Sequence, residues 1–208
     1  MFDPALFFAF VAAAALLTVT PGVDNAMVLR AAATEGARSG AFAAFGISLG
    51  CLVWAGAVSV GLGALLHASE LAYTILKWIG AAYLIWLGLK LLLKPRTQLN
   101  ETDAPAPQAG FAAMRAGFFT NVTNPKIGVF YVTFLPQFIP QGANVAAYSF
   151  LLASVHVIIG LAWFTALIAA TVPIGRMLRR PSVVRTLDRI TGGVFIAFGL
   201  KLAISRAA

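Results

Sequence analysis

Two short polar stretches interrupt long apolar segments of the chain, and each of them carries a charged side chain. They are TPGVDN at 20–25 and NVTNPK at 121–126. An acid in the first and a base in the second could hold the ammonium and the carboxylate of an amino acid, while asparagines supply neutral hydrogen bonds. The candidate binding residues are Asp24, Asn25, Asn121, Asn124 and Lys126.

Each stretch also has the form of a helix break. A proline ends or kinks the helix before it, but it is well tolerated at the first position of a new helix after a capping residue. Asn124 is a strong cap before Pro125, and Thr20 is a weaker one before Pro21. Gly22 permits close approach of the backbone. The sequence predicts helix breaks at Thr20, Pro21, Gly22 and Pro125, with a simple proline kink as the alternative at each place.

A helix that restarts inside a membrane presents unpaired N–H groups and a positive dipole end, which suits an anion. Lys126 lies about 15 residues into an apolar segment, near mid-depth, where a lysine costs about 3 kcal/mol and faces a bundle or a wet cavity. We expect Lys126 and the helix end at Asn124 to hold a carboxylate. Asp24 would meet an amine or carry a proton; its alternative role is to interact with its own helix dipole.

Composition indicates what surrounds these residues. The chain of 208 residues is 60% hydrophobic and only 11% charged, whereas soluble domains are about a quarter charged. Segments of about 20 apolar residues are long enough to cross a bilayer as helices. We therefore predict an all-α integral membrane protein that forms a single domain over 1–208. The expected transmembrane helices are 4–29, 41–66, 71–93, 111–136, 145–172 and 187–205.

The two halves of the chain resemble each other. WIGAAYLIWLGLKLLL at 78–93 is similar to RITGGVFIAFGLKLAI at 189–204, an offset of 189 − 78 = 111 residues. The TPG and NPK motifs lie 124 − 20 = 104 residues apart. These matches pair the first expected helix with the fourth and the third with the sixth. The first and the fourth are the two helices that contain the predicted breaks. Because each half has an odd number of helices, the sequence predicts a 3+3 inverted-topology repeat, typical of secondary transporters. Its parts are repeat one at 1–93, a cytoplasmic linker at 94–110 and repeat two at 111–208.

The chain has a net charge of +8, and the distribution of its basic residues indicates the topology in the membrane. Lys and Arg remain on the cytoplasmic side of a membrane. The side with few of them, which holds Lys77, Lys201 and Arg206, is expected to be periplasmic, together with both termini. Because the basic residues are distributed by membrane side, we attribute them to topology and anionic lipid, and we expect no nucleic-acid partner. The basic residues of the cytoplasmic side are Arg30, Arg38, Lys90, Lys94, Arg96, Arg115, Arg176, Arg179, Arg180, Arg185 and Arg189.

The sequence lacks the residues that several other classes of function require. With Cys51 alone and two histidines in the chain, neither a thiol pair nor a metal site on those ligands is expected. The sequence shows neither an HExxH metal helix nor paired aspartates at membrane depth, so we predict that the protein is not an enzyme and needs no cofactor. His156 could relay protons or serve a hydrogen-bonded packing role. Glycines at small-xxx-small spacing predict tight helix packing, and they are Gly36, Gly40, Gly46 and Gly50.

The two motifs resemble the signatures of the LysE/RhtB family of amino-acid exporters. TPGVDNAMVLRAAATEGARSGAFAAFGISLG at 20–50 is similar to the first signature, and NPKIGVFYVTFLPQF at 124–138 to the second. The family commonly has proline where Val23 stands. The resemblance covers essentially the whole chain and implies a multi-pass protein of the bacterial inner membrane.

The same resemblance implies a secondary active exporter of an amino acid or close derivative, driven by proton influx as an antiporter. Its partners would be the substrate, protons and membrane lipid, with a homodimer left open. The alternative is efflux of a drug-like amphiphile or a metal cation by the same fold. A metal exporter should concentrate acids at mid-depth, and only Asp24 is available there.

Overall fold

The computed structural model describes residues 3–68, 70–95, 109–171 and 180–204. These residues form helices and no strand, so the predicted all-α class is confirmed for this part of the chain. The linker predicted at 94–110 and both termini lie largely outside the described residues. The elements are α1 Pro4–Val19, α2 Val23–Glu35, α3 Ala37–Ala68, α4 Glu70–Leu93, α5 Phe111–Val122, α6 Pro125–Val129, the π-helical turn η2 Phe130–Phe134, the 3₁₀ turn η3 Leu135–Phe138, α7 Val145–Ala169 and α9 Pro181–Ile204.

Length and apolar character single out a few of these helices as membrane spans. Ala37–Gly61 within α3 and the whole of α7 are long and apolar enough to cross a bilayer. The pair α1 and α2 counts as a third span if it is taken together, although it bends by 53° at its break. Trp78–Leu93 within α4 is apolar but shorter. Membrane-spanning helices are thus found, while the full set predicted from the sequence is not established by the described helices.

Local sequence explains where the first helices start and stop. The carboxylate of Asp3 accepts a hydrogen bond from the N–H of Leu6 at 3.1 Å and so caps α1. Gly36 has φ of 87° and ends α2, because a residue with a side chain rarely adopts this conformation. No atom of the described chain lies within 4 Å of the place where a Cβ on Gly36 would stand. The prediction that Gly36 packs tightly against a neighbouring helix is therefore wrong; it makes the turn between α2 and α3.

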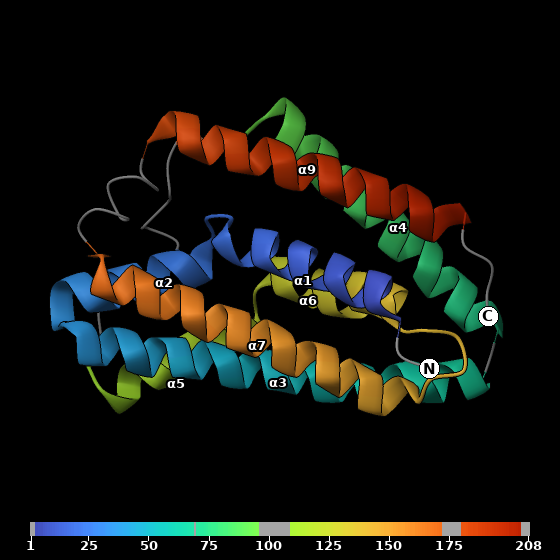
Figure 1. Ribbon diagram of the computed structural model, residues 1–208, viewed down its shortest axis with the longest axis horizontal. Helices are drawn as coiled ribbons and strands as arrows, with labels where there is room; N and C mark the ends of the chain where they lie inside the picture. The colour runs from blue at the N-terminus through green and yellow to red at the C-terminus, as the bar shows by residue number, and fades with distance from the viewer. Residues whose placement is uncertain (1–2, 69, 96–108, 172–179, 205–208) are drawn as a thin grey trace.

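The helices form two groups with α1 and α6 between them (Figure 1). On one side α4 and α9 pack against each other along their length. On the other side α3 packs against α2, α5 and α7. Thr20 at the end of α1 contacts the first of these groups, because its hydroxyl shares a 2.6 Å hydrogen bond with the hydroxyl of Thr191 on α9. The start of α1 and the end of α9 lie at the same end of the molecule (Figure 1).

Glycines bring α3 and α5 into backbone contact. A methyl group on Gly46 would overlap the carbonyl oxygen of Met114 and lie 2.9 Å from the backbone nitrogen of Phe118. A methyl group on Gly117 would likewise overlap the carbonyl oxygen of Ala43. Close approach through small residues is the usual way in which membrane helices associate. This contact fixes α5, and with it Asn121, against α3.

An aromatic cluster holds the second broken helix in place. The rings of Phe130, Phe134 and Phe138 follow one another along η2 and η3 and are buried. They pack against Phe10 of α1 and Phe198 of α9, and the Phe134 and Phe198 ring centres are 4.1 Å apart. The cluster lies next to α6, so it anchors the segment that carries Lys126.

Candidate functional site

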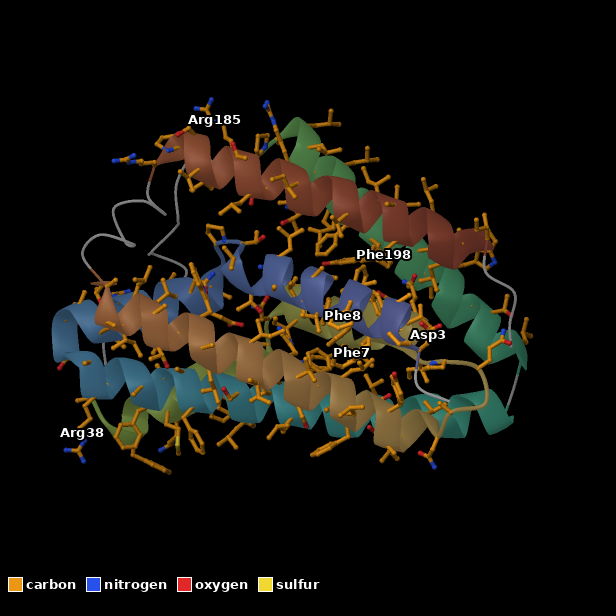
Figure 2. The ribbon with its side chains drawn as sticks, in the orientation of Figure 1. Asp3, Phe7, Phe8, Arg38, Arg185 and Phe198 are labelled. Atoms are coloured by element: carbon orange, nitrogen blue, oxygen red, sulfur yellow. The ribbon has the colours of Figure 1, made fainter. Side chains whose placement is uncertain are left out.

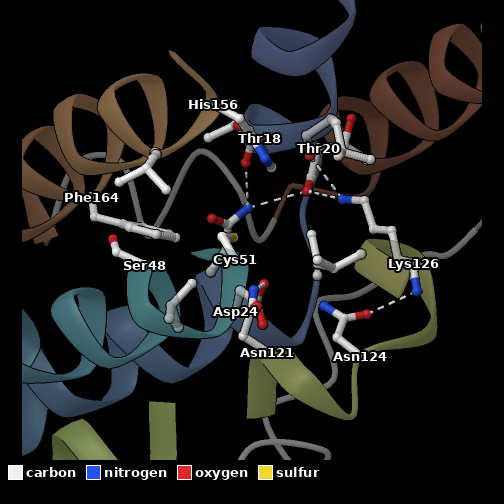
Figure 3. Close-up of a pocket in the computed structure, with 17 residues that line it drawn as sticks. Thr18, Thr20, Asp24, Ser48, Cys51, Asn121, Asn124, Lys126, His156 and Phe164 are labelled. Carbon is white, nitrogen blue, oxygen red and sulfur yellow. Dashed lines mark hydrogen bonds between the residues drawn. The ribbon is translucent and has the colours of Figure 1, made fainter. Parts of the chain in front are cut away.

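Lys126 satisfies backbone groups that the first break leaves unpaired. Pro21 has no N–H, so the carbonyl of Leu17, four residues earlier, cannot receive its normal helical hydrogen bond. The ammonium of Lys126 donates to this carbonyl at 2.8 Å and to the carbonyl of Thr20 at 3.0 Å (Figure 3). A residue of the second break thus caps the end of the helix before the first break, where a cation is favoured by the helix dipole.

Asn25 completes this cap from α2. Its side-chain Nδ2 donates to the carbonyls of Thr18 and Thr20, both at 3.1 Å. Its Oδ1 accepts a 3.1 Å hydrogen bond from Nε1 of Trp163 on α7. Because both donors and the acceptor of the amide are engaged, Asn25 holds the break and α7 together.

The second break is capped locally. Asn124 Oδ1 accepts a hydrogen bond from the backbone N–H of Lys126 at 3.0 Å. Pro125 has no N–H, and the N–H of Ile127 donates to the carbonyl of Asn124 at 3.1 Å. The first turn of α6 therefore does not present the unpaired donors that a broken helix was expected to offer an anion.

The start of α2 is more open. Its first residue follows Gly22, which is extended and has no side chain to cap the helix. A Cβ placed on Gly22 would lie 3.7 Å from Nζ of Lys126, so the lysine ammonium stands beside this helix end. The N-terminal N–H groups of α2 and the Lys126 charge thus form the positive side of the site.

Asp24 provides the negative side. It lies in the first turn of α2 and is 9% exposed. Its Oδ2 accepts a 2.9 Å hydrogen bond from Nδ2 of Asn121, which comes from α5. Its Oδ1 is buried and has no hydrogen-bond partner among the described residues. Buried acceptors are normally paired, so this oxygen is suited to a donor that arrives from the cavity, such as an ammonium or a proton.

Asn121 is fully buried, and Gly50 makes room for it. A methyl group on Gly50 would lie 2.6 Å from Oδ1 and 2.9 Å from Cβ of Asn121. The close contact between α3 and α5 therefore sets the direction from which Asn121 holds the Asp24 carboxylate.

These groups line one cavity with about 470 Å³ of empty space, including the part that opens outward. All five candidate binding residues predicted from the sequence lie in its wall, together with Thr20 and Gly22, whereas Pro21 and Pro125 do not. The remaining wall comes from the end of α1, from Ile127, and from faces of α3 and α7. Those two faces contribute Ile47, Ser48, Cys51, His156, Val157, Gly160 and Phe164.

Sequence reasoning missed most of the α7 face. His156, Gly160 and Phe164 recur at a spacing of four residues, which places them on one side of the helix. His156 is buried, and its Nδ1 lies 3.1 Å from the hydroxyl of Tyr131. This hydrogen bond fits the packing role, and the same side chain also reaches the cavity wall. The four-residue spacing was the available signal, but α7 is apolar on all sides and so conceals it.

Comparison with known proteins identifies the family. The model of the LysE type translocator matches residues 15–206. The chain belongs to the LysE family of translocators. It is 32% identical over 202 residues to a homoserine/homoserine lactone efflux protein of Salmonella typhi, which covers 97% of both chains. It is 29% identical over 199 residues to a leucine efflux protein of an Enterobacter species, which covers 95% of this chain and 94% of that one.

A third relative, an uncharacterized membrane protein of Vibrio cholerae, is 30% identical over 99% of this chain. No solved structure matches the chain. Members of the LysE family are translocators, so the protein is a transporter and not an enzyme, as predicted. The resemblance noted in the sequence is confirmed over nearly the whole chain.

Proposed function

We propose that the protein is a secondary active exporter that moves an amino acid or a close derivative out of the cytoplasm across the bacterial inner membrane. One observation carries this proposal: a buried carboxylate and a lysine ammonium line the same cavity, where two helix breaks meet, and one oxygen of the carboxylate has no hydrogen-bond partner among the described residues. An amino acid carries the two complementary charges. The efflux functions named for the two relatives support the same cargo class.

The polar groups then take distinct roles. Asp24 Oδ1 accepts from the substrate ammonium, and Asn121 orients the Asp24 carboxylate. The substrate carboxylate lies toward Lys126 and the open N-terminus of α2. Asn25 and Asn124 support the site by capping the two breaks. Export is coupled to proton influx, with Asp24 exchanging a proton for the ammonium during the cycle.

Purified protein in proteoliposomes tests the function. Vesicles loaded with unlabelled alanine, homoserine or leucine should accumulate the labelled compound by counterflow, and an imposed pH gradient should drive net movement. Vesicles without protein set the background. Absence of counterflow with every amino acid, from protein that remains folded, would refute amino-acid export.

A drug-like amphiphile is the second candidate, because Ile47, Val157 and Phe164 form an apolar part of the wall. The same vesicles loaded with a lipophilic dye cation decide between them, since an amphiphile exporter would move the dye and leave amino acids in place. A metal cation has less support. Among the described residues, no group of three or more His, Cys, Asp and Glu side chains could hold a metal ion.

For the architecture we propose the 3+3 inverted repeat, and a contact between α4 and α9 supports it. A methyl group on Gly88 would lie 2.6 Å from the carbonyl oxygen of Gly192, and one on Gly199 would lie 3.1 Å from that of Ala81. The offset of 111 residues found in the sequence converts 88 into 199 and 81 into 192. The offset therefore converts each of these two contacts into the other, which is the relation expected for a two-fold axis between α4 and α9.

In an inverted repeat, the turn between α2 and α3 and the turn between η3 and α7 should lie on opposite sides of the membrane. Arg38 and Arg185 lie at one end of the molecule and Asp3 at the other (Figure 2), which supports a cytoplasmic side at the basic end. In a Cys51→Ala background, Gln141→Cys should react with an impermeant maleimide in intact spheroplasts. Thr34→Cys should react only after the membrane is opened. Labelling of both cysteines from outside would contradict the inverted repeat.

Replacement of Lys126 by methionine, which keeps most of the length of the side chain but removes its charge, should impair transport. The carbonyls of Leu17 and Thr20 would lose a charged donor, and such hydrogen bonds are worth ~1.5–3 kcal/mol. We expect counterflow to fall about tenfold to a hundredfold, the factor that corresponds to this energy. Ser154→Ala on the exposed side of α7 is the control for insertion. Full activity of Lys126→Met would show that neither the cap nor the charge is needed.

A further inference from the structure

Gly160 on α7 differs from the glycines that pack helices together. It is buried, yet the nearest atom to a Cβ placed on it is Cε2 of Phe164, at an ordinary 3.9 Å. At Gly50 the same added atom would lie 2.6 Å from Asn121, and at Gly88 it would lie 2.6 Å from Gly192. Packing of the described chain thus gives no reason for a glycine at 160. Because Gly160 lines the cavity, the space above it belongs to the cavity.

The wall around Gly160 is largely apolar, although His156 on the same side of α7 and Ser48 on α3 also line the cavity. Val157 and Phe164 lie one turn away from it on α7, and Ile47 lines the same cavity from α3. Phe164 is only 5% exposed. In Figure 3, Phe164 and Lys126 stand on opposite sides of the cavity, with Asp24 between them. The side of the cavity at Phe164 is therefore mainly apolar, with Ser48 beside the ring, whereas Asp24 and Lys126 lie away from it.

We propose that Gly160 sets the largest substrate side chain that the exporter accepts, and that Ile47, Val157, Gly160 and Phe164 form the subsite for that side chain. This inference rests on the proposed export of amino acids and adds to it a substrate class. The subsite takes an uncharged aliphatic side chain. A cationic side chain would lose its hydration against this wall without an acid to compensate it, because Asp24 already holds the substrate ammonium.

Substitution at Gly160 tests the proposal through selectivity. Gly160→Ala and Gly160→Leu add one and four carbon atoms, and the first of them, the Cβ, lies no closer than 3.9 Å to the packed neighbours of the described chain. A single methyl group in an apolar pocket changes discrimination by about tenfold or more. We expect the ratio of leucine to alanine counterflow to fall about tenfold in Gly160→Ala, and leucine counterflow to be lost in Gly160→Leu. Lysine should not be transported by the wild type.

Ala162→Leu is the matched control, because it adds similar bulk to the same helix at an exposed position. It should leave the ratio of leucine to alanine unchanged. Phe164→Ala is the opposite test, since it enlarges the subsite and should raise the ratio of phenylalanine to alanine counterflow. If Gly160→Leu transports nothing, Gly160→Ala and Phe164→Ala still decide the question by opposite shifts in selectivity.

The failure of this inference differs from the failure of the proposed function. If the wild type shows no counterflow of any amino acid, amino-acid export itself is wrong. If the wild type transports amino acids and Gly160→Ala and Phe164→Ala both keep its selectivity, the subsite lies elsewhere. Counterflow of lysine as fast as that of leucine would overturn the assignment of an uncharged side chain.

Discussion

Gly46→Ala is expected to destabilise the protein strongly, although it adds a single methyl group. The added carbon would overlap the carbonyl oxygen of Met114 and lie 2.8 Å from its carbonyl carbon. Both atoms belong to the backbone of α5, so they cannot rotate away as a side chain would. The two helices must separate, and overpacking of this kind costs ~3 kcal/mol or more. Thermal unfolding in detergent, followed by tryptophan fluorescence, should show a clear fall in the midpoint.

Gly56→Ala provides a control on the same helix. No atom of the described chain lies within 4 Å of the place where its Cβ would stand. Alanine also favours a helix over glycine by about 0.5–1 kcal/mol. The midpoint should therefore stay the same or rise. Equal midpoints for Gly46→Ala and wild type would mean that α3 and α5 do not touch at this glycine.

Asp24→Asn is expected to reduce amino-acid counterflow about a hundredfold. The substitution keeps the size of the side chain and removes the charge that the ammonium needs, and truncating a buried charge pair costs ~2–5 kcal/mol. The midpoint of thermal unfolding should change little, since Oδ1 has no partner in the described part of the folded protein. Initial rates of counterflow for each amino acid give the measurement.

The same variant separates the two roles of Asp24. A group that only carries the coupling proton is needed for movement driven by a pH gradient but not for exchange of substrate on both sides. Normal counterflow in Asp24→Asn, with loss of the gradient-driven movement, would contradict the ammonium site. Thr120→Val is a suitable control, because it removes a neighbouring buried hydroxyl that likewise has no partner within the described ranges of the chain and does not line the cavity.

Much of the fold was accessible from the sequence because its strongest signals are local. Proline cannot take part in a continuous helix, so the interruptions next to Pro21 and Pro125 are set by the residues themselves. The expected segment 111–136 corresponds to the interrupted run from α5 to η3. The change to π-helical and 3₁₀ turns within this run was not predicted. The π-helical turn comes directly before the 3₁₀ turn that contains Pro136. Because Pro136 has no N–H, it disturbs the hydrogen bonds of the turn before it.

The site was predictable on its polar side only. A charged or amide side chain in an apolar segment is conspicuous, which is why Asp24, Asn121 and Lys126 could be named from the sequence. Their partners were not predictable, because the bond from Lys126 to Leu17 joins residues 109 positions apart. Gly160 and Phe164 were missed for a different reason. In a membrane helix both the lipid-facing side and the cavity-facing side are apolar, and only tertiary packing tells them apart.

The attachment of Lys126 to the end of α1 affects how the molecule can move. The side chain of Lys126 links the second half of the chain to the first. Any tilt that separates the two halves at this point must first break its hydrogen bonds to two carbonyl oxygens. The carboxylate of a bound substrate would compete for the same ammonium and so weaken this link while the substrate is in place. Bound substrate would thus ease the movement that export requires.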